Sequence, residues 1–238
     1  MKCLSLWAAI GTLFLACHPI YADVVLQYDL EGMLGSEATV AGIAPDGGIA
    51  ALDLRRGTGL GSTGAADSFN SNGWDSPPPI SPSAADEYFS FGFTVDGATS
   101  VVLSDLTIST RSSDTGPGTL GLYSNLDNFT ASLHTFTQSG TTPLDPIIDL
   151  SSLGTLTNQT VEFRLIEIGN TQADGTGTTS GGGTFRVTNF ERSASQPITF
   201  SGTISAVPEP STLLGCLISG LILASVRCRS PRRNLQAE

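Results

Sequence analysis

Hydrophobic and polar residues alternate with a period of two through the middle of the chain. In residues 87–95, EYFSFGFTV, the side chains of Phe89, Phe91, Phe93 and Val95 fall on one face, and smaller or more polar ones fall on the other. This alternation predicts a half-buried β-strand. Similar runs predict seven further strands, at residues 24–30, 49–54, 100–110, 119–124, 160–168, 183–191 and 198–204. No segment shows a convincing period of 3.6, which an amphipathic helix requires.

The segments between the predicted strands are rich in Gly, Pro, Ser, Asn and Asp, as in residues 174–183. These residues favour turns and loops. Eight or more strands without amphipathic helices predict an all-β fold, a single β-sandwich of jelly-roll type over residues 23–204. Within residues 100–110 the apolar positions change register, which predicts a β-bulge near Ser104 or Asp105.

The N-terminus has the three parts of a secretory signal peptide. Lys2 supplies a positive start, residues 4–16 are apolar, and Ala22 ends a small-residue cleavage site. We therefore expect residues 1–22 to form a signal helix and the chain to be exported.

Composition limits what the exported part can do. The four cysteines lie near the two ends of the chain, so residues 23–207 contain none and must be held together by a core, without disulfides. The same stretch has no lysine, and its six arginines and twenty acidic residues give it a formal charge of −14. Such a surface repels phosphate backbones, so we expect no nucleic-acid partner.

The residues that most catalytic mechanisms need are scarce in this stretch. His134 is its only histidine, so neither a multi-histidine zinc site nor a serine–histidine pair is indicated, and we expect it on a strand surface. Residues 59–64 spell Gly-x-Gly-x-x-Gly, but no helix follows to meet a pyrophosphate. A glycosidase pair of carboxylates stays open, although the spacing of twenty acids assigns no pair. We assign no catalytic residue and expect no enzyme activity.

We expect no cofactor, with calcium as a weaker alternative. Five aspartates lie in or near predicted turns, where hard cations find oxygen ligands. They are Asp114, Asp127, Asp145, Asp149 and Asp174. Because no EF-hand loop or nonapeptide repeat spaces them for binding, solvated turn residues are the favoured interpretation, and no metal site is assigned.

Trp74 is the only tryptophan after the signal segment. Set among Asn and Asp residues, its ring would suit stacking on a sugar, with Tyr88 or Tyr123 as further candidates for an aromatic binding face. Trp74 is therefore a candidate ligand-binding residue. The favoured alternative is that its large apolar ring anchors the loop against the edge of the sandwich.

The C-terminus combines three features in order. A linker over residues 205–212 contains the triplet Pro208, Glu209 and Pro210. Residues 213–226 are apolar, and a basic tail follows over residues 227–238 with Arg227, Arg229, Arg232 and Arg233. This run resembles the PEP-CTERM sorting signal of bacterial envelope proteins. The resemblance implies handling by an exosortase, a membrane transpeptidase, in bacteria that make exopolysaccharide. Residues 107–133 also resemble, more loosely, a segment common in such proteins, which implies a jelly-roll scaffold.

The apolar segment is short for a permanent membrane span. As a helix, residues 213–226 would cover about 21 Å, against about 30 Å for the hydrocarbon core. The arginines would stay on the cytoplasmic side and fix the orientation, which leaves the Pro-Glu-Pro triplet accessible outside. We therefore expect a transient membrane helix that is removed by the processing enzyme, with an ordinary C-terminal anchor as the alternative.

These observations predict an exported, non-catalytic β-sandwich in the cell envelope, on the cell surface or in the extracellular matrix. Its expected partners are an exosortase-type enzyme, the membrane before processing, and exopolysaccharide. The alternatives are a carbohydrate-binding module, which needs aromatic residues on one open face, and a secreted carboxylate-dependent glycosidase, which needs two buried or semi-buried acids facing one cleft.

Overall fold

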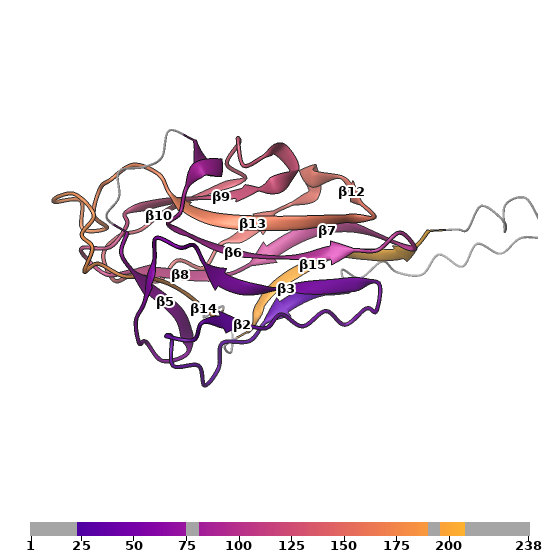
Figure 1. The fold of residues 1–238 in the computed structure, drawn as a ribbon, viewed down its shortest axis with the longest axis horizontal. Helices are drawn as coiled ribbons and strands as arrows, with labels where there is room; N and C mark the ends of the chain where they lie inside the picture. The colour runs from indigo at the N-terminus through magenta and orange to yellow at the C-terminus, as the bar shows by residue number, and fades with distance from the viewer. Residues whose placement is uncertain (1–22, 75–80, 190–195, 208–238) are drawn as a thin grey trace, which may run out of the picture.

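A computed structural model describes residues 23–74, 81–189 and 196–207, which form an all-β protein built from antiparallel sheets (Figure 1). Three short 3-10 helices lie in the described loops: η1 (Pro82–Ala84), η2 (Asn125–Asp127) and η3 (Ser151–Leu153). The strands belong to a five-stranded, a six-stranded and a four-stranded sheet.

The five-stranded sheet has the order β1-β15-β7-β11, and β12 also pairs with β7. Its strands are β1 (Asp23–Tyr28), β15 (Ile198–Ala206), β7 (Thr99–Thr107), β11 (Ile147–Asp149) and β12 (Thr155–Leu156). The six-stranded sheet has the order β10-β9-β13-β6-β3-β2. Its strands are β10 (His134–Thr137), β9 (Thr119–Ser124), β13 (Gln159–Glu167), β6 (Tyr88–Val95), β3 (Ile49–Arg56) and β2 (Thr39–Val40). The four-stranded sheet consists, in order, of β4 (Gly61–Ser62), β5 (Ser68–Asn72), β14 (Phe185–Thr188) and β8 (Ser109–Ser112).

The core lies between the six-stranded sheet and the other two sheets. Phe200 of β15 contacts Phe163 of β13, with ring centroids 5.0 Å apart. Farther along the same sheet, Phe185 of β14 and Phe69 of β5 both contact Phe89 of β6, at 5.7 and 5.2 Å. The five-stranded and four-stranded sheets therefore cover the same face of the six-stranded sheet, which gives a β-sandwich-like arrangement.

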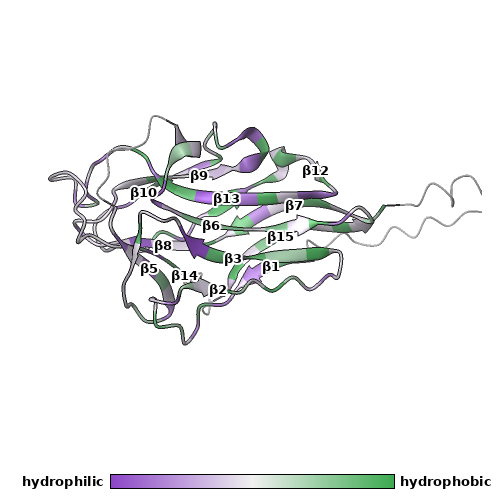
Figure 2. Ribbon diagram, viewed as in Figure 1, coloured by the Kyte–Doolittle hydropathy of each residue, from purple (hydrophilic) through white to green (hydrophobic). Residues whose placement is uncertain are grey.

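All eight segments with period-two alternation form strands, and Figure 2 shows hydrophobic and hydrophilic bands alternating along them. The predicted segment 100–110 is divided between β7 and β8, and 183–191 contains the shorter β14. The strands that the pattern did not predict are short or polar, such as β5 with the sequence SFNSN. The prediction of an all-β fold is confirmed.

The bulge predicted in β7 is also confirmed. Asp105 pairs with Ser201, whereas Leu103 pairs with Gly202, so Ser104 is an extra residue on β7. The extra residue shifts the alternation by one position and lets the apolar residues on both sides of the bulge face the core.

The described chain begins and ends at the same end of the sandwich. Asp23 pairs with Gly202 across β1 and β15, and the backbone N–H of Val207 donates to the carbonyl of Ala98 at 2.8 Å. β15 continues to Ala206, beyond the predicted domain end at residue 204. The longer loops gather at the opposite end (Figure 1).

No helix within the described ranges is long and apolar enough to cross a membrane. The predicted signal helix, residues 1–22, and the predicted membrane segment and tail, residues 213–238, lie outside the described residues.

Candidate functional site

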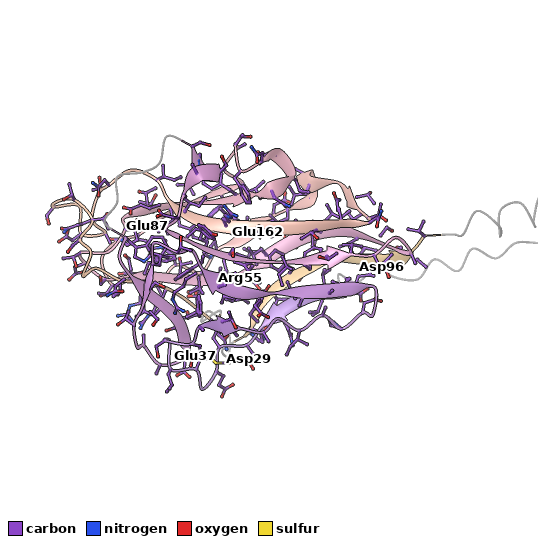
Figure 3. The ribbon with its side chains drawn as sticks, viewed as in Figure 1. Asp29, Glu37, Arg55, Glu87, Asp96 and Glu162 are labelled. Atoms are coloured by element: carbon purple, nitrogen blue, oxygen red, sulfur yellow. The ribbon has the colours of Figure 1, made fainter. Side chains whose placement is uncertain are left out.

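A polar groove of about 360 Å³ crosses β3, β6 and β13 on the face of the six-stranded sheet that points away from the core. Figure 3 shows two residues of this groove, Arg55 and Glu162, over the middle of the sheet. The groove is lined by Leu52, Asp53, Arg55, Tyr88, Ser90, Phe91, Glu162 and Arg164. Its volume lies within the range of about 300–1,000 Å³ that small-ligand sites occupy.

A β-bulge in β3 builds one wall of this groove. Leu52 pairs with Gly92 and Arg55 pairs with Ser90, so β3 carries one more residue than β6 between these pairs. Residues three positions apart on a regular strand point to opposite faces. The bulge changes this, and both Leu52 and Arg55 reach the groove while Leu54 is buried in the core.

Tyr28 holds the bulge from the opposite sheet. Its hydroxyl donates to the carbonyl of Leu52 at 2.7 Å and accepts a hydrogen bond from the N–H of Gly92 at 3.0 Å. Burial raises the pKa of Tyr28, so the hydroxyl stays protonated as a donor. Gly92 has φ +152, and a Cβ there would lie 2.0 Å from the carbonyl oxygen of Val161, so only glycine fits at this position.

Arg164 is fixed in the groove by three contacts. Its guanidinium lies between two aromatic rings, 4.3 Å from the centroid of Tyr88 and 4.2 Å from that of Phe129. Its Nε donates to Oε1 of Glu162 at 2.8 Å, and the two side chains are 16% and 28% exposed. The cation–π contacts and the ion pair hold the partly exposed side chains of Arg164 and Glu162 in one geometry.

The adjacent arginines of β3 have different environments. Arg56 points to the other side of the strand, where its guanidinium stacks 3.7 Å from the ring centroid of Phe69 and donates to the backbone carbonyls of Gly35 and Asn70. Burial lowers the pKa of Arg56 to about 10. Arg55 is exposed and makes no side-chain hydrogen bond or ion pair with any described residue. Arg56 therefore holds the fold together, and Arg55 is available to a ligand.

Two buried acids, Glu87 and Glu167, lie at the end of the sandwich where the longer loops gather. Glu167 ends β13 and Glu87 precedes β6, and these side chains are only 7% and 8% exposed. Burial raises the pKa of Glu167 to about 7, a hydrogen bond from Thr179 opposes this shift, and the nearby charge of Glu87 adds to it. A raised pKa suits the general acid of glycoside hydrolysis, but neither carboxylate lines the groove over β3, β6 and β13.

The structure corrects the expectation for Trp74. Its side chain is fully buried, its indole N–H donates to the carbonyl of Ser71 at 3.2 Å, and its ring packs edge-on against Phe89 and Phe185 at 5.4 and 5.5 Å. The prediction that Trp74 stacks on a ligand is therefore wrong, and the alternative of a loop anchor is confirmed.

The two tyrosines named with Trp74 have different positions. Tyr123 is 7% exposed and packs in a small separate cluster with Phe129 and Ile166. Tyr88 is half-buried and reaches the groove with its ring beneath Arg164. The described groove therefore presents one tyrosine among mostly polar side chains.

The structure also shows the positions of His134 and of the Gly-x-Gly-x-x-Gly segment. His134 begins β10, where it is half-buried and pairs with Leu122, so the prediction of a strand-surface histidine is confirmed. The Gly-x-Gly-x-x-Gly segment forms a turn and the short strand β4, with no helix after it in the described loop.

Two of the five turn aspartates bond within their own loops. The carboxylate of Asp127 accepts hydrogen bonds from the N–H groups of Thr130 and Ala131, and Asp149 accepts one from Ser151. These bonds lower the pKa of both aspartates. No group of three or more His, Cys, Asp or Glu side chains in the described part of the chain is arranged to hold a metal ion.

The predicted sorting residues lie outside the described residues. They are Pro208, Glu209, Pro210, Arg227, Arg229, Arg232 and Arg233. A comparison of the chain with protein-family models, curated proteins and solved structures gives no match.

Of the polar and aromatic groove residues, only Tyr88 was predicted from the sequence as a candidate for binding. Glu162 and Arg164 occupy the outward positions of TVEFRLIEI, between core residues, and this charged alternation was the available signal. Arg55 had no comparable signal, because its outward direction depends on the bulge.

Proposed function

We propose that the protein is an exported, surface-displayed or matrix-associated, non-catalytic β-sandwich that binds a glycan in the groove over β3, β6 and β13. The observation that carries this proposal is the fixed arrangement of Arg164 and Glu162 beside Arg55, which has no ion pair to a described residue, in one polar groove. Carbohydrate binding, the alternative drawn from the sequence, is kept as the specific form of the proposal, with the hydrogen-bonding groups of the groove in place of the open aromatic face that was expected.

A glycan suits the groove because each sugar hydroxyl both donates and accepts hydrogen bonds. The guanidinium groups of Arg55 and Arg164 supply only donors, and the carboxylates of Asp53 and Glu162 supply only acceptors when ionised. Charged partners also make stronger hydrogen bonds than neutral ones. Leu52 adds an apolar contact for the carbon–hydrogen face of a ring.

The finer description of the fold as a jelly roll is part of the proposal. The arrangement of eight strands supports it. In the five-stranded sheet, β1, β15, β7 and β11 lie side by side in this order, and in the six-stranded sheet the neighbouring strands are β6, β13, β9 and β10. Along the chain these strands alternate between the two sheets except at β9 and β10, which follow each other in the six-stranded sheet, and this order is typical of two interlocked Greek keys. In this interpretation β2, β3 and the four-stranded sheet are additions to the basic jelly roll.

Sorting through the C-terminal signal completes the proposal. The partner would be an exosortase-type enzyme that cuts near Pro208, Glu209 and Pro210, after residues 213–226 and the arginines have held the chain in the membrane. The common end of β1 and β15 supports such a display, because the longer loops then point away from the attachment point. A glycosidase using Glu87 and Glu167 has less support, because neither side chain lines this groove.

Two measurements test the proposal. A glycan-array screen of the exported protein tests binding, and we expect signals on a defined set of glycans. Intact-mass analysis of the protein from its native host tests sorting, and we expect a C-terminus near residue 210. An array without any signal would contradict the first part, and a mass that includes residues 213–238 would contradict the second.

A further inference from the structure

We propose that the groove selects neutral, hydroxyl-rich polysaccharides over polymers that carry carboxylates or sulfates. This inference rests on the proposed glycan-binding function and names its ligand class.

The charges in the groove are balanced. Arg55 and Arg164 bring two positive charges, and Asp53 and Glu162 bring two negative charges. Arg164 already has its counter-charge, because its Nε is bonded to Glu162, and its guanidinium also contacts the rings of Tyr88 and Phe129. An acidic sugar bound at Arg164 would bring its carboxylate close to that of Glu162.

The carboxylates of the groove, which accept hydrogen bonds, also favour hydroxyl groups over acidic groups. An ionised Asp53 or Glu162 forms hydrogen bonds only with donors. A sugar hydroxyl supplies such a donor, whereas an ionised carboxylate or sulfate on the polymer supplies none and is repelled. Arg55 is the one groove cation without an ion pair to a described residue, and it lies in the same groove as Asp53.

The charge of the whole domain acts in the same direction. Residues 23–207 carry a formal charge of −14, so a polyanion approaching the groove meets a repulsive field. This field is screened beyond about 8 Å at physiological salt. The repulsion therefore weakens at high salt, whereas contacts with a neutral polymer change little.

The test compares two polymers and two variants of the exported protein. Titration calorimetry would measure binding of a neutral glucan and of a polyuronate of similar length, at about 0.15 M salt and again at high salt. We expect the glucan to bind at least tenfold more tightly at physiological salt, with an affinity that salt hardly changes. We expect the polyuronate to gain relative affinity as salt rises.

The variant Asp53→Asn removes one negative charge from the groove, and Asp105→Asn removes one from the outer side of the five-stranded sheet as a matched control. Asp53→Asn should improve polyuronate binding severalfold more than Asp105→Asn does. Equal or tighter polyuronate binding by the wild type, weakened by salt, would overturn the inference and leave glycan binding intact. Absence of binding to either polymer, together with an empty array, would overturn the proposed function itself.

Discussion

The hydroxyl of Tyr28, which belongs to the five-stranded sheet, lies 2.7 Å from the carbonyl oxygen of Leu52, at the start of the bulge in the six-stranded sheet. A buried residue of one layer thereby fixes the backbone beneath a groove on the outside of the other layer. The geometry of the groove and the stability of the core are coupled through this contact.

Replacing Tyr28 with Phe tests that coupling. The change leaves the N–H of Gly92 without its hydroxyl partner in a buried position, which costs about 1–3 kcal/mol. We expect a lower free energy of unfolding in urea and weaker glycan binding. Tyr123→Phe is the matched control, because its side chain is also buried and no hydrogen bond to a described residue involves its hydroxyl. Equal stability of the two variants would contradict the role given to Tyr28.

The strands were predictable from the sequence because burial of one sheet face imposes a period of two. Even the bulge at Ser104 left a visible change of register. The groove was not predictable, because it joins β3, β6 and β13, whose pairing depends on long-range contacts. The burial of Trp74 was equally hidden, since its polar loop gives no sign that Phe89 and Phe185 enclose the ring.

Glu167 should make the stability of the domain depend on pH. Its pKa rises from 4.5 to about 7 in the folded state, so the folded protein binds more protons than the unfolded chain between these values. The contribution of Glu167 to the free energy of unfolding is then fully present below about pH 4.5. It is lost as pH rises toward 7, by on the order of 2 kcal/mol. Urea unfolding at pH 5 and pH 8 measures this change.

The variant Glu167→Gln isolates this effect from other titrating groups. His134 acts in the opposite direction, because burial lowers its pKa and favours the folded state as pH rises. Both proteins contain His134, so their difference reports Glu167 alone. We expect the variant to lose most of the decline between pH 5 and pH 8. A decline of the same size in both proteins would show that Glu167 is not its source.

Trp74 gives a spectroscopic check on the structure of its loop. It is the only tryptophan after residue 22, and its ring is fully buried. We expect a blue-shifted fluorescence maximum that iodide barely quenches and that bound glycan leaves unchanged. Trp74→Ala should cost about 3–5 kcal/mol, as removal of a large core side chain does. Strong quenching by iodide would instead place the ring in solvent.

The most direct test of glycan binding compares Arg55→Gln with Arg111→Gln. Arg55 lines the groove, whereas Arg111 lies on β8 of the four-stranded sheet, and neither has a hydrogen bond or ion pair to a described residue. Neither change should therefore affect folding. Affinity would be measured by calorimetry for the tightest glycan found on the array. We expect Arg55→Gln to weaken binding about tenfold, equivalent to about 1.4 kcal/mol, and Arg111→Gln to leave it unchanged. Equal affinities of the two variants and the wild type would contradict the claim that this groove binds the glycan.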